Sequence, residues 1–109
     1  MKYMMIVCWD PSIKAPETDE DADTNDWVTE MDGRGVRLDG RPLSPDEATT
    51  VRVRNGEVLV SDGPFAETKE LMVGYDLLEC ADLDEAIEVA SKHPLAKHGA
   101  MELRPFGAD

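Results

Sequence analysis

The turn pair Asn55-Gly56 constrains the fold more than any other feature of this chain, because it lies between two runs of β-branched residues. Asn-Gly favours a type I′ turn, whose twist matches that of the two antiparallel strands that it joins. The pattern therefore predicts a β-hairpin from Thr49 to Ser61.

The two-residue turn also determines which residues face each other across this hairpin. The predicted register pairs Arg54 with Glu57, Val53 with Val58, and Val51 with Val60. Because side chains alternate between the two faces of a strand, both valine pairs fall on one face. Arg52 and Leu59 fall on the other. We expect the valine face to be buried and the other face to be mostly polar.

Three further segments have the patterns of strands. The apolar run from Lys2 to Cys8 ends in the turn cluster Asp10-Pro11-Ser12 and is typical of a buried strand. The run from Leu71 to Cys80 predicts a long strand, in which Gly74 indicates a bulge or a close backbone approach. Apolar and charged residues alternate from Ala100 to Phe106, which predicts a final strand.

Asp82 marks the start of an amphipathic helix. An Asp at the N-cap with Glu85 three residues later is a capping signature, and Ala86 and Ala90 recur at helical spacing. Pro94 predicts that the helix ends after His93.

The acidic segment from Glu17 to Asp32 contains eight acidic residues and no basic one. Self-repulsion predicts that its first half, Glu17 to Asp23, is loosely ordered. Carboxylates at the spacing of a calcium loop occur at Asp19, Asp21, Asp23 and Glu30. Thr24 replaces the glycine that such a loop needs for its sharp turn, so no metal site is predicted.

The elements between this segment and the hairpin are predicted to be short. Thr24 can cap a brief helix that carries Trp27 and Met31 on one face. A strand is predicted at Val36 to Leu38, and Ser44-Pro45 indicates a helix start with room for one or two turns.

This order of elements predicts an α+β fold, with two helices on one face of an antiparallel sheet. A chain of 109 residues is enough for one domain, which we place at residues 1–109. One short helix and one amphipathic helix cannot cover both faces of the sheet. We therefore expect a homodimer that buries the other face.

The charge of the chain argues against one class of partner. Lys and Arg number 11 against 24 Asp and Glu, which gives a net charge of −13, so nucleic acid is not expected as a partner. No apolar run reaches the roughly 18 residues of a membrane span, and Met1 to Cys8 is too short for a signal peptide. We expect a cytoplasmic protein without a membrane contact, in which Cys8 and Cys80 are reduced core residues.

One loop has a distinctive sequence. It runs from Asp62 to Glu70 and reads Asp-Gly-Pro-Phe-Ala-Glu-Thr-Lys-Glu, and Gly74-Tyr75 follows it. With the later His98-Gly99 and Glu102-Leu103-Arg104-Pro105, this loop resembles the YCII-related DGPF-domain proteins. The resemblance covers roughly two thirds of the chain and departs from the family between Asp10 and Leu43.

The resemblance implies a ferredoxin-like βαββαβ fold, here with an extra β-hairpin, that dimerises through its sheet as a dimeric α+β barrel. In the wider family a His and Asp pair in a cleft, with the His on the first helix, is a suggested active site. Here the histidines are His93 and His98, so that pair does not carry over intact. Some relatives are associated with sigma-factor genes, which implies a signalling or accessory role for part of the family.

The loop that begins at Asp62 is also the predicted functional site. Binding groups tend to lie on loops held by a rigid sheet, and Glu67 to Glu70 add more charge than a turn needs. Asp62 and His98 are the candidate catalytic residues, because a carboxylate or a neutral imidazole can move a proton. The candidate substrate-binding residues are Gly63, Pro64, Phe65, Lys69 and Tyr75. His93 is explained instead as a cation at the end of a helix.

Two functions are consistent with these residues. In the first, a cofactor-free enzyme acts on a small carbonyl or carboxylate compound in a cleft beside the Asp62 loop. No nucleotide or metal motif occurs, so no cofactor is expected. In the second, the chain is a non-catalytic accessory module that binds a ligand or a protein, with a possible link to sigma-factor regulation.

Overall fold

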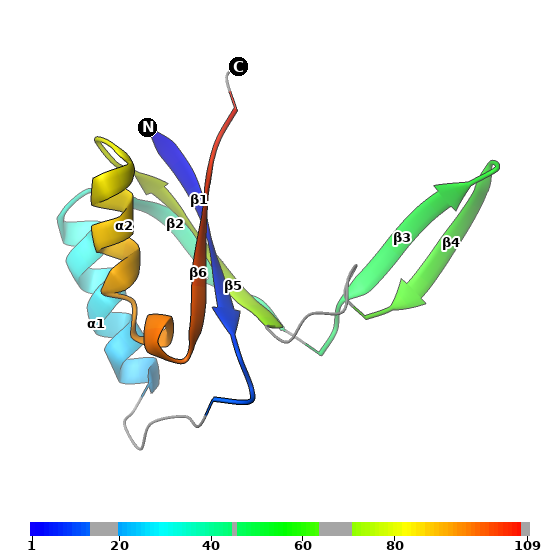
Figure 1. The fold of residues 1–109 in the computed structure, drawn as a ribbon, viewed down its shortest axis with the longest axis horizontal. Coiled ribbons are helices and arrows are strands. Elements are labelled where there is room, and N and C mark those ends of the chain that lie inside the picture. The colour runs from blue at the N-terminus through cyan, green and yellow to red at the C-terminus, as the bar shows by residue number, and fades with distance from the viewer. Residues whose placement is uncertain (14–19, 45, 64–70, 108–109) are drawn as a thin grey trace.

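The computed structural model describes residues 1–13, 20–44, 46–63 and 71–107 (Figure 1). Its elements in chain order are β1 (Lys2–Trp9), α1 (Glu20–Gly33), β2 (Arg37–Pro42), β3 (Thr49–Arg54), β4 (Glu57–Asp62), β5 (Leu71–Glu79), α2 (Leu83–Ser91), the 3₁₀ helix η1 (Pro94–Lys97) and β6 (Gly99–Pro105).

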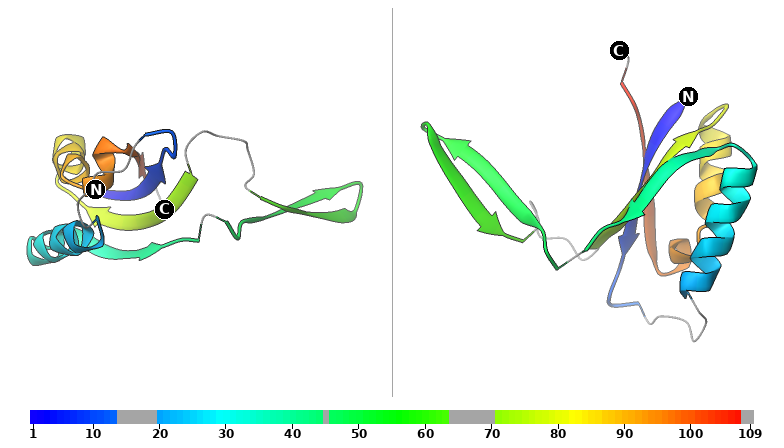
Figure 2. Two further views of the ribbon diagram at one scale, coloured as in Figure 1. Left: turned by 90° about the horizontal axis from the view of Figure 1, so that it is seen from below. Right: turned by 180° about the vertical axis from the view of Figure 1, so that it is seen from behind.

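Four of the strands form an antiparallel sheet in the order β2-β5-β1-β6. Helices α1 and α2 lie side by side on one face of this sheet (Figures 1 and 2). The predicted α+β class is therefore confirmed, and without β3 and β4 the order of elements is βαββαβ. We call the sheet with its helices the body of the molecule. None of the helices in the described ranges is long and apolar enough to cross a membrane.

The hydrophobic core lies between the sheet and the two helices. It consists of Tyr3, Met5, Val7, Trp27, Met31, Val36, Leu78, Cys80, Ala86, Val89 and Ala90. Because strand side chains alternate, the neighbours of the core residues on β1 and β5 point to the opposite face of the sheet. That opposite face, which we call the open face, carries the half-buried side chains of Met4, Ile6, Cys8, Tyr75 and Leu77.

The predicted start of α2 is confirmed. The Asp82 carboxylate accepts a hydrogen bond of 2.9 Å from the Glu85 amide, and the Glu85 carboxylate accepts one of 2.9 Å from the Ala81 amide. These reciprocal bonds satisfy amides at the helix N-terminus that have no partner within the helix. The helix ends at Ser91, and Pro94 begins the η1 turn.

Helix α1 is longer than expected. It begins at Glu20 rather than near Thr24, so its first turn includes part of the segment expected to be loosely ordered. Trp27 and Met31 are buried in the core, with exposed fractions of 4% and 0%. The Trp27 indole also donates a 3.0 Å hydrogen bond to the Val89 carbonyl of α2. Tertiary packing of this kind stabilises a helix whose own sequence pattern is weak. Residues 14–19 lie outside the described part of the chain.

Two other short elements also differ from the expectation. β2 has six residues rather than three, because it continues past a register irregularity between Arg37 and Asp39 along β5. The helix expected after Ser44-Pro45 is wrong for residues 46–48, which are not helical, while Pro45 itself lies outside the described residues. The Gly63 amide donates a 2.8 Å bond to the Ala48 carbonyl, so this segment extends the hairpin instead.

The two long strands of the C-terminal half agree closely with the predictions. β5 has a bulge in its pairing with β1, where Val7 faces Gly74 and Cys8 faces Met72. A Cβ atom at Gly74 would lie 3.2 Å from the Arg41 carbonyl, so the predicted close approach is also confirmed. β6 covers Gly99–Pro105, one residue earlier than expected.

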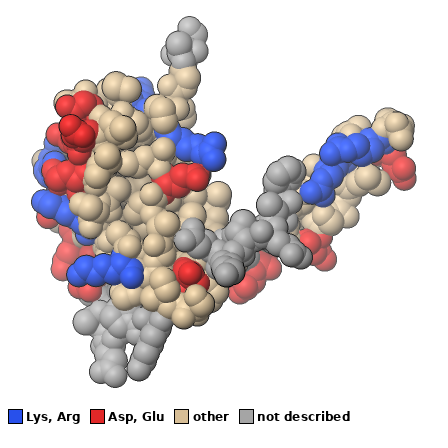
Figure 3. Space-filling model, viewed as in Figure 1, with Lys and Arg blue, Asp and Glu red and all other residues tan. Residues whose placement is uncertain are grey.

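Strands β3 and β4 form a separate hairpin that projects from the body, which we call the arm (Figures 1 and 2). The predicted register is confirmed at every pair, and Asn55 and Gly56 have the φ values of +52° and +78° that a type I′ turn needs. The expectation of a buried valine face is wrong. Val51, Val53, Val58 and Val60 are 57% to 65% exposed, because the arm lies beside the body rather than on it. Basic side chains are visible along the arm in Figure 3.

Candidate functional site

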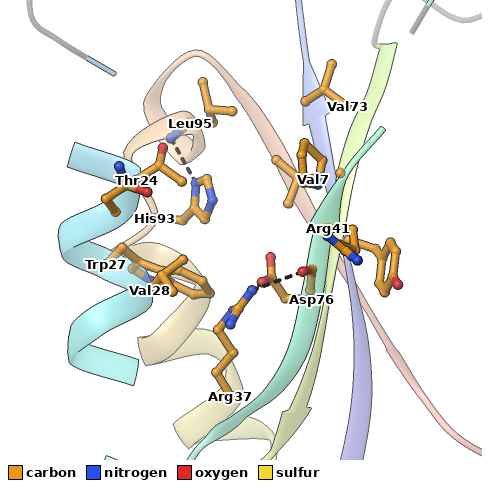
Figure 4. Close-up of a pocket in the computed structure, with 15 residues that line it drawn as sticks. Val7, Thr24, Trp27, Val28, Arg37, Arg41, Val73, Asp76, His93 and Leu95 are labelled. Carbon is orange, nitrogen blue, oxygen red and sulfur yellow. Dashed lines mark hydrogen bonds and ion pairs between the residues drawn. The ribbon is translucent and has the colours of Figure 1, made fainter. Parts of the chain in front are cut away.

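A pocket of about 650 Å³ lies between α1, the sheet and the turn that follows α2 (Figure 4). Apolar walls come from Val7, Trp27 and Val28, together with Val73 and Leu95. Its polar lining includes Thr24, Asn25, Arg37, Arg41, Asp76 and His93. An apolar cleft with a few converging polar groups is the usual form of a small-molecule site.

His93 points into this pocket from the turn after α2 (Figure 4). His93 is 4% exposed, and its ring contacts that of Trp27 with 4.8 Å between ring centroids and 59° between the ring planes. Burial lowers the pKa of His93 to about 4, so the imidazole is neutral at pH 7. The expected role as a helix-end cation is therefore wrong, because a neutral ring cannot interact with the helix dipole as a charge.

The hydrogen bonding of His93 determines which ring nitrogen carries its proton. The Leu95 amide donates a 3.1 Å bond to Nδ1, so Nδ1 is an acceptor and the proton of the neutral ring is on Nε2. Nε2 has no hydrogen-bond partner among the described residues. The ring thus offers the pocket an N–H donor.

Asp76 lies across the pocket from His93, on the sheet (Figure 4). Its side chain is 9% exposed, and its Oδ1 accepts a 2.8 Å bond from Nε of Arg37. Burial raises the pKa of the Asp76 carboxyl, although the bond from Arg37 acts in the opposite direction. Oδ2 has no hydrogen bond to the described residues and is the proton-accepting atom that the carboxylate can present to a ligand.

Arg37 holds Asp76 in place and donates further hydrogen bonds. Besides Asp76, it donates 3.2 Å bonds to the Asp32 carboxylate and to the Gly40 carbonyl. A Cβ atom at Gly40 would collide with the Asp76 carboxylate and lie 2.6 Å from Nη2 of Arg37. The absence of a side chain at position 40 is therefore what allows this ion pair to form.

The structure places the predicted catalytic residues away from this pocket. Asp62 is the last residue of β4 on the arm, and its side chain is exposed. Gly63, with φ of +104°, closes the base of the arm, where its carbonyl accepts a 2.8 Å bond from the Thr50 hydroxyl. His98 ends η1 and has a buried Nδ1 without a partner in the described ranges, but it is not among the residues that line the pocket.

The other predicted residues have mixed positions. Pro64, Phe65 and Lys69 lie outside the described residues. Tyr75 contributes to the pocket from β5, but it pairs with Arg41 and alternates with Asp76, so its side chain lies on the open face. The roles assigned to these residues, and to Asp62 and His98, stay predictions.

The sequence analysis did not select Asp76, Arg37 or His93. For Asp76 a signal was present, because it alternates in register with Gly74 and Leu78 on a strand that was correctly predicted. A carboxylate at a core position of an apolar strand needs a buried partner, which marks it for inspection. The pairing with Arg37, 39 residues away, depends on the β2–β5 register and had no local signal.

Comparisons with known proteins agree with the resemblance described above. The family model of the YCII-related domain matches residues 1–106. A curated relative, "Uncharacterized protein R00369" from Rhizobium meliloti (strain 1021), is 48% identical over 61 residues, which are 54% of this chain and 49% of the relative. The chain thus spans about half the length of the curated relative that it matches. With a family match that extends over nearly all of its residues, the chain belongs to the YCII-related family.

Proposed function

We propose that the pocket is the active site of a cofactor-free enzyme that moves a proton on a small carbonyl compound. The observation that carries this proposal is the pair of groups on opposite walls, a neutral N–H donor on His93 and a carboxylate on Asp76. The two groups differ in what they can do with a proton, which is the arrangement that acid–base catalysis needs.

In the proposed reaction, Nε2–H of His93 donates a hydrogen bond to the carbonyl oxygen of the substrate. Asp76 removes a proton from the adjacent carbon, and the electron pair of the broken C–H bond moves toward the oxygen to form an enolate. Asp76 then returns the proton to the same carbon or to a neighbouring one, so that the compound is isomerised. The neutral imidazole stabilises the developing negative charge on oxygen by this hydrogen bond, and it does not transfer its proton to the substrate.

Arg37 acts as a positioning residue in this scheme. Its bond to Oδ1 fixes the carboxylate, and the raised pKa of Asp76 makes it a stronger base than an exposed aspartate. The apolar walls lower the polarity around the carbon that is deprotonated, which strengthens both polar interactions.

The experiment has a binding step and a chemical step. Small ketones, aldehydes and matched carboxylates are first screened for an increase in melting temperature. Compounds that bind are then incubated with the protein in D₂O, and NMR follows deuterium entry at the carbon next to the carbonyl. Asp76→Asn should keep binding and slow this exchange by about 10²- to 10⁴-fold, because the amide cannot accept the proton.

Asp62→Asn is the matched control, since it makes the same chemical change at a residue that the sequence favoured, and His98→Gln tests the other residue that the sequence favoured. If these variants abolish exchange while Asp76→Asn does not, the proposed pocket is the wrong site and the Asp62 loop is the right one. If no compound binds or exchanges, the non-catalytic accessory module becomes the better account.

A further inference from the structure

Arg37 is a cation in the lining of the pocket, and the protein itself balances its charge (Figure 4). Its Nε donates a hydrogen bond to Asp76 at 2.8 Å, its Nη1 to Asp32 at 3.2 Å, and its Nη2 to the Gly40 carbonyl at 3.2 Å. Two carboxylates therefore share one guanidinium, so these three side chains are negative as a group when both acids are ionised. An anionic ligand would have to compete with both carboxylates for this cation.

Arg41 also lines the pocket, but its side chain belongs to the other face of the sheet. Gly40 pairs with Asp76, and a Cβ atom at Gly40 would collide with the Asp76 carboxylate, so position 40 is on the pocket side of β2. Alternation along the strand then directs Arg41 to the open face, where it pairs with Tyr75. The Arg41 guanidinium is therefore no counterion for a ligand held beside Asp76.

The other basic side chains beside the two helices have positions on the surface. Arg34 lies 2.8 Å from Glu88, and Lys92 lies 3.5 Å from both Glu30 and Glu88. Lys97 at the end of η1 is exposed and is not among the residues that line the pocket. Among the described residues, these cations thus give an anion in the pocket no direct partner.

We propose that the substrate of this pocket is an uncharged carbonyl compound with an apolar body, and not a carboxylate or a phosphate ester. This inference rests on the proposed function, in which the carbonyl oxygen lies at His93 and the reacting carbon at Asp76. The neutral His93 ring offers the oxygen a hydrogen bond but offers a second, anionic group no counterion. Such a group would lose its water without gaining a partner, and Asp76 would repel it.

The charge of the whole chain acts in the same direction. A net charge of −13 lowers the concentration of anions near the surface and leaves that of neutral compounds unchanged. On α1, the exposed acids Asp23 and Asp26 flank Thr24 and Asn25, which line the pocket. A neutral substrate therefore reaches the pocket more readily than an anionic analogue of the same shape, most of all at low ionic strength.

The first test compares the binding of matched compounds that differ in charge and scarcely in shape. The probes are acylpropionates with acetyl, cyclohexanecarbonyl or benzoyl groups, and the isosteric acylpropionamides. Isothermal titration calorimetry on the wild-type chain should give each acid that binds a dissociation constant at least about tenfold higher than that of its amide. The deuterium exchange assay is run on the same compounds, so that chemistry is recorded separately from binding.

The second test gives the pocket a cation. Asn25→Lys adds one positive charge to the lining, so the ratio of the acid and amide dissociation constants should fall by about three- to tenfold. Thr29→Lys is the matched control, because it adds the same charge at an exposed residue of α1 that does not line the pocket. It should change the ratio by less than about twofold. Thermal melts establish that both variants are folded.

The outcomes separate this inference from the proposed function. If the wild-type chain binds the acids as tightly as the amides, or more tightly, the inference is overturned, and Asp76-dependent exchange of the acids would leave the proposed function standing without it. If the amides bind better but do not exchange, the neutral ligand is supported and the proposed chemistry is contradicted. An equal fall of the ratio in Thr29→Lys, or binding of none of these compounds, would also overturn the inference.

Discussion

The body and the arm are built from strands with similar sequence patterns, yet they differ in burial. On β1 every second side chain is buried beneath the helices, whereas on β4 every residue is exposed. The register of the arm follows from a local rule, because type I′ turn geometry determines it. In the sheet, strand alternation predicts only which side chains share a face. What local rules do not specify is whether a second layer lies over the apolar face. The comparison shows that a correct prediction of strand pairing does not by itself predict which strand face is buried.

The largest expected effect comes from removing an apolar side chain from each region and comparing the two changes in the free energy of unfolding. Leu78→Ala in the body should lower the free energy of unfolding by about 3 kcal/mol, because Leu78 is 0% exposed and a cavity would remain. Val58→Ala on the arm should change it by less than about 0.5 kcal/mol at submicromolar concentration, because the side chain is 64% exposed. Urea denaturation measures both values.

An equal loss in the two variants at low concentration would break the comparison. A loss for Val58→Ala that grows with protein concentration would sharpen it, because the arm would then be buried by association rather than by folding.

The second prediction concerns pH. His93 is in the body, and burial lowers its pKa from the ordinary 6.5 to about 4. In the unfolded chain His93 therefore takes up a proton below about pH 6.5, whereas in the folded chain it takes up that proton only near pH 4. Stability is fully present above pH 6.5 and should fall by up to about 3 kcal/mol as the pH drops to 4.

Thermal melts over this pH range measure the effect. His93→Gln should flatten the dependence, and His98→Gln is the control that should retain it. The raised pKa of Asp76 acts in the opposite direction, because the folded state then gains a proton before the unfolded state does, and it offsets part of the loss at the acidic end. An unchanged slope in His93→Gln would show that the ring is not kept neutral by the fold.

The smallest expected effect is at the tip of the arm. Gly56 has a φ of +78°, so Gly56→Ala should destabilise the turn by about 1 kcal/mol. Amide hydrogen exchange measured by NMR should accelerate by about fivefold across β3 and β4 and stay unchanged in the body. Acceleration that extends into β1 or β5 would show that the arm and the body unfold as one unit.

The parts of the fold that the sequence predicted are those set by residues close together in the chain. Asn55-Gly56 determines the arm register, and Asp82 with Glu85 determines the start of α2. The extent of α1 was missed because Trp27 and Met31 stabilise it through contacts with distant residues, and its acidic first turn shows no apolar period.

The pocket was missed for the same physical reason. It forms where the turn after α2 meets the sheet, so His93 and Asp76 come together only after the helices have packed. The sequence did show that two histidines were available, but the burial that keeps His93 neutral is a property of the packed structure. The loop from Asp62 to Glu70 drew attention by its unusual residues, and chemical distinctiveness in a sequence is no measure of location in the fold.

The contact between Trp27 and His93 also gives the pocket its own optical reporter. Indole emission depends on the polarity and charge of its surroundings, and this indole contacts the imidazole with 4.8 Å between ring centroids. The chain contains two tryptophans, so Trp9→Phe leaves Trp27 as the sole emitter. The fluorescence of that variant would then record both the arrival of a ligand beside the ring and the protonation of His93, in real time and without a label.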